Sequence, residues 1–210
     1  MDSSKTNGPQ SASSSEPLEL LRARPAKERA DAARNREKVL AAAARLFADK
    51  GVEAVSMDAI AAAAGVGKGT LFRRFGDKSG LAVALLDARE YELQERVLSG
   101  PPPLGPGAPA AARLSAFMDA YLTYLFAHLD LVRMSETASP GARYRIGAYR
   151  FWHRHVSILL AECRPGADAD PLAHALLAAV SAETAGVVRQ EHGDERARQA
   201  IMTLAAALAS

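Results

Sequence analysis

The sequence contains little of what secreted, membrane-spanning or sheet-rich proteins need. Cys163 is the single cysteine among 210 residues, so no disulfide can form within the chain, and a reducing cytoplasm fits. We expect Cys163 to be a small core residue rather than a reactive thiol. No run of about 20 apolar residues is available to span a bilayer. Residues 1–20 are polar and serine-rich, without the apolar segment of a signal peptide.

β-Branched residues are also scarce. Isoleucine and valine are few while alanine is abundant, which favours helices over strands. The net charge is only +2, but residues 1–80 carry 14 Lys/Arg against 10 Asp/Glu, whereas residues 81–210 carry 12 against 14. A polyanion would therefore bind at the N-terminal side, if anywhere.

Helical periodicity and helix-capping residues divide the chain. Residues 1–24 are rich in Ser, Pro and Gly and are expected to be a disordered tail. The basic residues that follow, from Arg22 to Arg36, indicate either a DNA-touching arm or a solvated helix start. The expected helices are a first one ending at Gly51, then 57–64, 68–75, 78–98, 110–129, 141–164, 170–189 and 194–209. Residues 99–109, "SGPPPLGPGAP", must be a connector.

The stretch "GVGKGTLFRRF", Gly65 to Phe75, admits two interpretations. A phosphate-binding loop needs G-x-x-x-x-G-K-[ST] between a strand and a helix. Here Gly69 follows Lys68, Ala62 stands where the first glycine should be, and an alanine-rich helix precedes the stretch. The nucleotide-binding interpretation therefore fails.

A helix-turn-helix fits the same residues. Gly65 can adopt the positive φ of a tight turn, and Ala61 is small enough for two helices to cross. One face of 68–75 can join a small core with Ile60, and the other face offers basic side chains without an acidic one. Such a helix can enter a major groove, although a solvated amphipathic helix would show the same pattern.

The segment from Val39 to Leu81, "VLAAAARLFADKGVEAVSMDAIAAAAGVGKGTLFRRFGDKSGL", resembles the DNA-binding domain of the tetracycline-repressor (TetR) family. The resemblance covers the "LF…G" end of the first helix, "IA…AGV" and "GTLF…F". It implies an all-α fold, with a three-helix DNA-binding domain at residues 33–92 (helix-turn-helix 56–75) and a helical ligand-binding and dimerisation domain at 93–210. Family members are typically dimeric repressors that small ligands release from DNA.

The predicted DNA-binding residues are Ser56, Lys68, Gly69, Thr70, Phe72, Arg73, Arg74 and Lys78. The resemblance places Lys68, Gly69 and Thr70 where bases are read. It places Arg74 and Lys78 at phosphate-contacting positions. Two positions depart from the family pattern: Phe72 replaces the usual tyrosine and lacks its hydroxyl, and Gly67 replaces a serine or threonine cap.

The C-terminal two thirds resembles the family only weakly, so its residues must be interpreted directly. Aromatic residues cluster between 117 and 152, which indicates either a small-molecule pocket or a plain core. The predicted pocket residues are Phe117, Tyr121, Tyr124, Tyr144, Tyr149, Phe151 and Trp152, with Phe126 nearby. Candidate polar contacts are Arg133, Glu136, Arg143, Arg150 and His155.

Catalysis finds no support in the sequence. His153 and His155 are two apart and point to different faces of a helix, which is poor zinc geometry. No catalytic triad or dyad can be identified, so we expect no enzyme activity, no metal and no cofactor.

Self-association is suggested by two stripes of residues. One is Ala175, Ala179, Ala182 and Gly186, and the other is Ala197, Ile201, Leu204, Ala205 and Leu208. They predict a four-helix interface of a homodimer, with packing inside one chain as the alternative. The expected partners are thus operator DNA, a second copy and a small-molecule effector, with no membrane. A helical ligand-binding or structural dimer without specific DNA binding remains the competing function.

Overall fold

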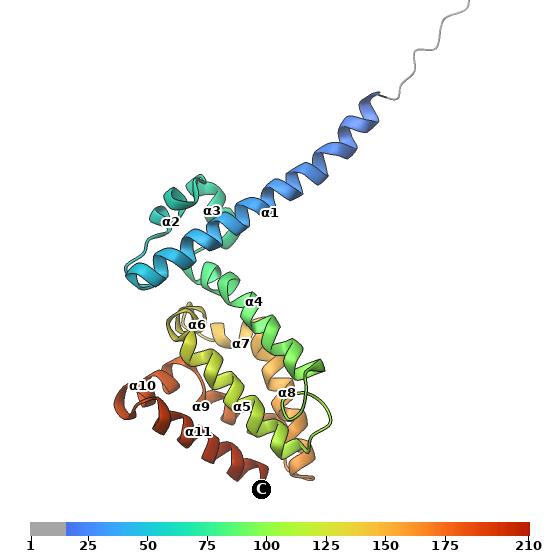
Figure 1. Ribbon diagram of the computed structural model, residues 1–210, viewed down its shortest axis with the longest axis vertical. Helices are drawn as coiled ribbons and strands as arrows, with labels where there is room; N and C mark the ends of the chain where they lie inside the picture. Colours follow the sequence, from blue (N-terminus) through green and yellow to red (C-terminus); the bar gives the residue numbers. More distant parts are fainter. Residues whose placement is uncertain (1–15) are drawn as a thin grey trace, which may run out of the picture.

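The computed structural model describes residues 16–210, with side chains described from residue 31 onward. In this part of the chain every regular element is a helix, so the all-α prediction is confirmed (Figure 1). The N-terminal helices are α1 (Glu16–Lys50), α2 (Met57–Ala64), α3 (Lys68–Phe75) and α4 (Lys78–Ser99). The C-terminal helices are α5 (Ala110–Ala127), α6 (Leu129–Glu136), α7 (Ala142–Arg145), α8 (Gly147–Cys163), α9 (Ala169–Ala179), α10 (Ala182–His192) and α11 (Asp194–Ala209). Of the predicted tail, residues 1–15 lie outside the described residues, whereas residues 16–24 belong to α1 rather than to an unstructured segment.

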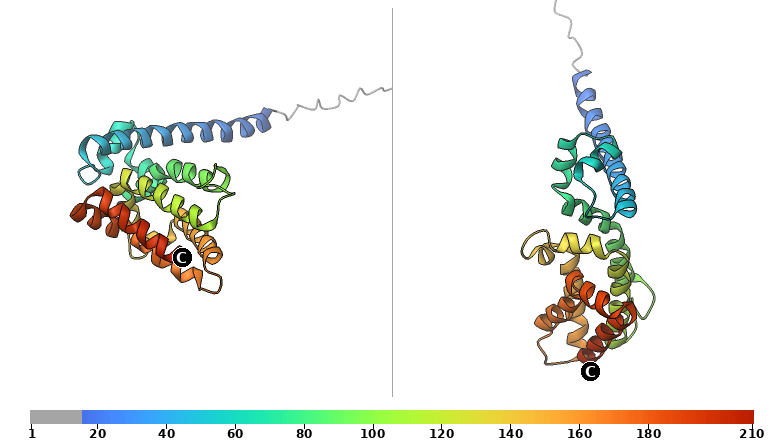
Figure 2. Two further views of the ribbon diagram at one scale, coloured as in Figure 1. Left: turned by 60° about the horizontal axis from the view of Figure 1, so that its bottom comes forward. Right: turned by 90° about the vertical axis from the view of Figure 1, so that its left-hand side faces the viewer.

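Helices α1 to α3 and the start of α4 enclose a small core of their own. It is built from buried residues of α1, the α1–α2 loop, α2, α3 and α4: Val39, Ala43, Phe47, Val52, Val55, Ile60, Ala61, Leu71 and Leu81. Figure 2 shows this group at one end of the molecule and the remaining helices at the other. The N-terminal group is therefore a compact unit that can present a surface independently of the larger core.

The larger core lies among α4, α5 and α8 to α11. Helix α5 packs on α8 and α11, and α8 packs on α9. Phe117, Leu122 and Leu159 are fully buried within it. The expected connector is confirmed, since no helix covers residues 101–109, and Leu104 of this connector is buried against the larger core.

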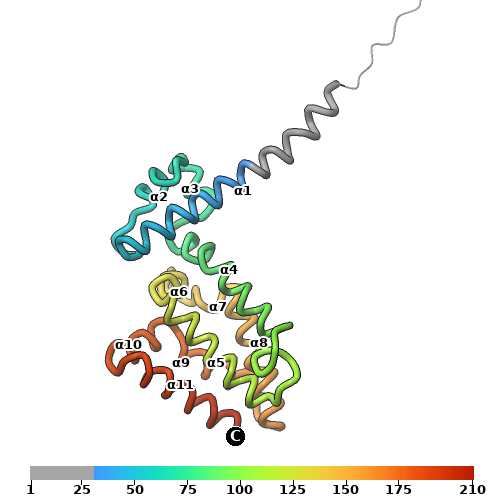
Figure 3. Tube along the Cα trace, viewed as in Figure 1, coloured from blue at the N-terminus to red at the C-terminus, as the bar shows by residue number. Residues whose placement is uncertain are grey.

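Two helices join the two units. Helix α4 runs from the N-terminal group into the larger core, as the trace in Figure 3 shows. Leu81 at its start is buried in the small core, whereas Leu93 and Val97 near its end are buried in the large one. Helix α6 packs along α4, and its Leu131 contacts both cores. A change in either core can therefore reach the other through α4 and α6.

Two expected helices are interrupted, and one helix was not expected. The expected helix at 141–164 is interrupted at Ile146 between α7 and α8. The expected helix at 170–189 breaks at Val180 and Ser181, because the Ser181 side chain accepts a hydrogen bond from the Thr184 N–H (3.1 Å) and begins a new helix. Helix α6 was missed, because His128 at its start makes no side-chain capping bond that would mark a helix beginning there.

The two predicted interface stripes are partly buried inside the chain. Ala182 is fully buried, and a Cβ built on Gly186 would lie 2.5 Å from Arg133 Nη2 of α6 in the same chain. On α11, Ala197, Ile201 and Ala205 are buried, and this helix packs on α5. The small residues let helices of one chain approach closely. Packing within the chain therefore accounts for five of the nine stripe residues, and the dimer interface stays a prediction.

No single helix in the described residues has the length and hydropathy needed to cross a membrane. The pair α9 and α10 passes such a test only when joined across its 46° bend, and Leu176, Leu177 and Ala182 of this pair are fully buried in the protein core.

Candidate DNA-binding face and ligand cavity

The turn between α2 and α3 has the features that the sequence predicted. The Ser56 hydroxyl accepts a hydrogen bond from the Ala59 N–H (3.1 Å) and begins α2. Gly65 ends α2 with φ 65° and ψ 35°, a left-handed conformation that costs glycine little. The Val66 N–H then donates to the Ala61 carbonyl (3.0 Å). These bonds fix the direction in which α3 leaves α2.

One face of α3 is buried as expected. Leu71 is 1% exposed and packs with Ile60, which is fully buried. Val66 and Phe75 are partly buried against the same small core. Rotation of α3 about its axis is thereby prevented, so the opposite face is held toward solvent.

The opposite face carries the predicted DNA-binding residues. Those exposed to solvent are Ser56, Lys68, Gly69, Thr70, Phe72, Arg73 and Arg74. Phe72 is 46% exposed, and Arg73 has no hydrogen-bond or ion-pair partner among the described residues. A Cβ on Gly69 would meet nothing within 4 Å, so the protein itself does not require glycine there.

Two cations of this face have partners within the protein. The Lys68 ammonium forms an ion pair with the Asp58 carboxylate in the first turn of α2. Arg74 donates from Nη1 to the Ala32 carbonyl of α1 at 2.8 Å. Both cations are exposed, and such exposed contacts are weak enough for a phosphate to replace them. Their DNA-binding roles stay predictions.

Lys78 is held more firmly. Its ammonium donates to the carbonyls of Val52 (2.9 Å), Val55 (3.2 Å) and Glu53 (3.3 Å). These three bonds use all three donors of the ammonium and fix the α1–α2 loop against α4. Lys78 thus has a structural role that sequence reasoning missed, and its predicted phosphate contact requires one of these bonds to be released.

The α3–α4 junction is tightly constrained. The Asp77 carboxylate accepts from the Ser79 hydroxyl (2.5 Å) and the Gly80 N–H (2.9 Å), which begins α4 and lowers the pKa of Asp77. A Cβ on Gly80 would overlap the backbone carbonyl oxygen of Phe75. Glycine is therefore required where the backbone of α4 meets the end of α3.

The aromatic cluster is mostly core. Phe117 and Trp152 are buried in ring contact, with centroids 5.6 Å apart, and Phe151 packs on Trp152 from the side. Tyr144 is 54% exposed. Phe117, Phe151 and Tyr144 do not line the cavity described next. Phe117 and Phe151 fit the plain-core alternative, whereas Tyr144 lies at the surface.

Four of the predicted aromatic residues do share one small cavity. Tyr121, Tyr124, Tyr149 and Trp152 line a space of about 20 Å³ together with Glu90, Glu136 and Arg143. Such a volume holds about one water molecule. The cavity therefore needs to widen before it can hold a larger ligand.

Tyr124 separates this cavity from a much larger groove. The groove, of about 680 Å³, lies between α4, α5 and the Pro101–Leu104 segment, and Tyr124 lines both spaces. The Tyr124 hydroxyl donates to the Glu90 carboxylate of α4 at 2.8 Å. Burial raises the pKa of Glu90, and the nearby Asp87 and Glu136 carboxylates raise it further. Glu90 was absent from the predicted site.

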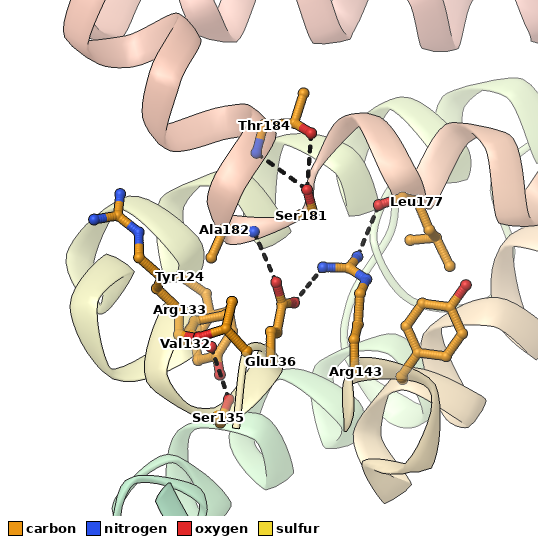
Figure 4. A network of polar contacts seen from close by, with 12 residues as sticks. Tyr124, Val132, Arg133, Ser135, Glu136, Arg143, Leu177, Ser181, Ala182 and Thr184 are labelled. Atoms are coloured by element: carbon orange, nitrogen blue, oxygen red, sulfur yellow. Dashed lines mark hydrogen bonds and ion pairs between the residues drawn. The ribbon is translucent and has the colours of Figure 1, made fainter. Parts of the chain in front are cut away.

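Glu136 and Arg143 form a buried ion pair behind the cavity (Figure 4). The second carboxylate oxygen of Glu136 accepts from the Ala182 N–H at the start of α10 (2.8 Å), and Arg143 donates to the Leu177 carbonyl of α9 (2.7 Å). Burial raises the pKa of Glu136 although Arg143 opposes the shift. One polar network thus ties the end of α6 to α7, α9 and α10.

The other candidate polar contacts lie elsewhere. Arg150 is exposed, and the exposed Arg133 side chain extends to Gly186 of α10. His155 is buried, lies edge-on to Phe117, and burial lowers its pKa to about 4. Cys163 is half-buried with a pKa raised by burial, which disfavours the reactive thiolate.

Residues 39–85 match the family model described as "Bacterial regulatory proteins, tetR family". An HTH-type transcriptional regulator of Staphylococcus aureus strain USA300 is 49% identical over 53 residues, which are 25% of this chain and 29% of that protein. The chain thus matches less than a third of the length of this curated relative. Both matches are to regulators of transcription rather than to enzymes.

Solved structures resemble the fold over most of the chain. A TetR-family regulator of Rhodococcus sp. superimposes with a TM-score of 0.59 at 19% identity, covering 85% of this chain and 100% of that one. The FadR repressor of Thermus thermophilus with lauroyl-CoA gives 0.62 at 16% identity, covering 83% and 92%. A regulator of Saccharomonospora viridis with choline gives 0.56 at 23% identity, covering 79% and 92%. Likeness at these identities concerns the fold alone, and it extends beyond the helix-turn-helix.

Proposed function

We propose that this chain, a transcriptional regulator of the TetR family, represses genes as a homodimer on a palindromic operator and is released by an organic cation. The observation that carries the DNA-binding part is the exposed basic face of α3, held outward by Leu71 on its inner side. Lys68 and Thr70 would meet base edges, and Arg73 and Arg74 would meet phosphates. A regulator acting on chromosomal DNA would work in the cytoplasm.

Dimerisation would place two copies of α3 in successive major grooves, about 34 Å apart. Because five of the nine stripe residues are buried inside the chain, the interface needs residues of these helices that are exposed. Val187 of α10 is 53% exposed and Leu204 of α11 is 40% exposed, which makes them the strongest apolar candidates on the last two helices. We place the dimer contact on the exposed faces of α10 and α11.

The residues of the small cavity favour a cationic effector. Aromatic faces attract cations through their quadrupole, and Tyr121, Tyr124 and Trp152 supply three such rings. Glu90 and Glu136 contribute two carboxylates against the single positive charge of Arg143. Solved structures of similar fold hold ligands as different as choline and lauroyl-CoA. The fold alone therefore does not indicate the class of ligand, and we base the proposed cation on the side chains that line the cavity.

Binding would start with the Tyr124–Glu90 contact. A cation near Glu90 competes for the carboxylate, and outward rotation of Tyr124 would join the cavity of about 20 Å³ to the groove of about 680 Å³. The combined space falls in the range of ordinary ligand sites. Because Glu90 belongs to α4, its movement would reach α3 through the tight junction at Gly80. A coupling of about 1–3 kcal/mol changes operator affinity roughly 5- to 150-fold.

Selection of bound fragments from genomic DNA tests the DNA-binding part. We expect enrichment of a palindromic site whose binding weakens with salt. Failure to retain any DNA at low salt would favour the competing function, a helical dimer without specific DNA binding. For the effector, operator release should occur with tetraphenylphosphonium or choline and not with laurate at the same concentration.

A further inference from the structure

Two histidines and a carboxylate meet on the surface where α8 packs against α9. Their ligand atoms, one each from His153, Asp170 and His174, all lie within 4.8 Å of one another. Asp170 and His174 are four residues apart and therefore share one face of α9. His153 comes from α8, and its Nε2 lies 3.1 Å from the Asp170 backbone carbonyl oxygen and 3.7 Å from Asp170 Oδ1. An ion bound at Nε2 would replace the hydrogen bond to that carbonyl. By sequence, His153 and His155 were rejected as a zinc pair, and the fold instead places His153 beside His174, 21 positions later.

The two imidazoles are positioned for chelation. The ring centroids of His153 and His174 are 3.9 Å apart with the planes inclined by 31°. Imidazole nitrogens that lie this close together can bind one cation between them. The Asp170 carboxylate, 69% exposed beside them, adds a negative charge and leaves one side of the cluster open to solvent.

A further residue orients one of these rings. The Tyr149 hydroxyl lies 2.6 Å from His174 Nδ1, and the Tyr149 ring stacks at 22° on the ring of His174. With Nδ1 occupied by this hydrogen bond, Nε2 is the nitrogen left for a metal. An outer partner of this kind is the usual companion of a metal-bound histidine, because it fixes the tautomer and the ring orientation.

We propose that His153, Asp170 and His174 form a binding site for a divalent transition-metal ion of the zinc type, with Tyr149 as the orienting residue. Two imidazole nitrogens and one carboxylate oxygen suit Zn²⁺, Co²⁺, Ni²⁺ or Cu²⁺, whereas Mg²⁺ and Ca²⁺ prefer sites made of oxygen atoms. A fourth position remains open on the solvent side. The ion would join α8 to α9. Because Tyr149 also lines the small cavity, metal binding would affect the position of a side chain in that cavity.

Calorimetric titration of the full-length, tag-free chain with Zn²⁺ tests this site. We expect saturable binding of one ion per chain, and a loss of affinity of at least about tenfold for His153→Ala, for His174→Ala and for Asp170→Asn. Tyr149→Phe should weaken binding less and keep the stoichiometry. His192→Ala is the matched control, because His192 is an exposed histidine beside the Glu191 carboxylate (3.7 Å) and lies outside the cluster.

Two further measurements distinguish a specific metal site from misfolded variants. Co²⁺ should give a visible d–d absorption with the parent chain that His174→Ala lacks, and circular dichroism should show that each variant keeps its helix content. Binding that saturates at no defined stoichiometry, or equal Zn²⁺ affinity of the parent and His174→Ala, would overturn the proposal. An equal loss in His192→Ala would reduce it to nonspecific surface binding.

Discussion

The Tyr124 hydroxyl donates a 2.8 Å hydrogen bond to the Glu90 carboxylate at the place where the small aromatic cavity meets the groove on α4 and α5. Glu90 lines the cavity, and Tyr124 lines both spaces. Glu90 lies on the buried side of α4, the helix that connects the larger core to the N-terminal unit. In the proposed switch, this contact would control both ligand entry and the position of α4.

Replacing Glu90 by Gln should make stability less dependent on pH. Burial raises the pKa of Glu90 in the folded chain, so the folded state binds the proton more tightly than the unfolded state. The stabilising contribution of protonated Glu90 is therefore fully present below the ordinary pKa of glutamate, about 4.3. This contribution is lost as the pH rises through the pKa that Glu90 has in the folded chain. Glu90→Gln should melt at a higher temperature than the parent at pH 8, and this advantage should vanish near pH 4. A difference in melting temperature that is constant from pH 4 to 8 would show that Glu90 ionisation is irrelevant.

Two glycine substitutions should act in opposite directions on stability. Gly69→Ala should stabilise the fold by up to about 1 kcal/mol, because alanine favours helix and nothing lies within 4 Å of its Cβ. It should nevertheless weaken operator binding, because only DNA can clash with that methyl group. Gly80→Ala should destabilise by about 1–3 kcal/mol through overlap with the Phe75 carbonyl. Chemical denaturation and operator titration of both variants test this, and unchanged operator affinity in Gly69→Ala would remove Gly69 from the DNA-binding face.

Lys68→Ala and Arg73→Ala should differ in their sequence dependence. If Lys68 reads a base, its loss should cost about 1–3 kcal/mol on the selected operator and relax preference at one symmetric position. Arg73 has no partner among the described residues, and its loss should weaken all sequences alike and flatten the salt dependence. Equal, sequence-independent losses from both variants would show that Lys68 reads no base.

The dimer should depend on the exposed apolar residues of the last two helices. Val187→Arg and Leu204→Arg should each raise the dimer dissociation constant at least about tenfold, because a buried unpaired charge is costly. Ile158→Arg is the control, since Ile158 of α8 is as exposed as Leu204, at 40%, but lies away from α10 and α11 in sequence. Sedimentation should show monomers for the first two variants only, and intact dimers for all three would move the interface elsewhere.

Much of the N-terminal unit could be predicted because its signals are local. The Ser56 cap, the positive φ of Gly65 and the inward face with Leu71 depend on neighbours within a few residues, and the structure confirms each. Family resemblance added DNA-binding roles that local rules cannot supply. The hydrogen-bond partners of Lys68, Arg74 and Lys78 could not be predicted from local sequence, because these partners lie in helices or loops at least ten residues away in the chain.

The C-terminal part was less predictable because long-range packing decides it. An aromatic residue in the sequence looks the same whether it lies in a core, as Phe117 does, or beside a cavity, as Trp152 does. Small residues likewise suit contacts within or between chains, and Gly186 faces Arg133 of its own chain. One overlooked signal was Glu90, which shares a helical face with the buried residues Leu86, Leu93 and Val97. A carboxylate in such an apolar stripe indicates a specific polar site.

Trp152 provides the most direct measurement of the proposed switch. It is the only tryptophan of the chain and lines the aromatic cavity. Titration of its fluorescence with an operator-releasing cation should be performed with and without operator DNA. We predict that operator DNA weakens cation binding by the same factor, roughly 5 to 150, by which the cation weakens operator binding, as linkage requires. Release of the operator by the cation with no change in Trp152 emission, or release by laurate alone, would contradict a cation site in this cavity.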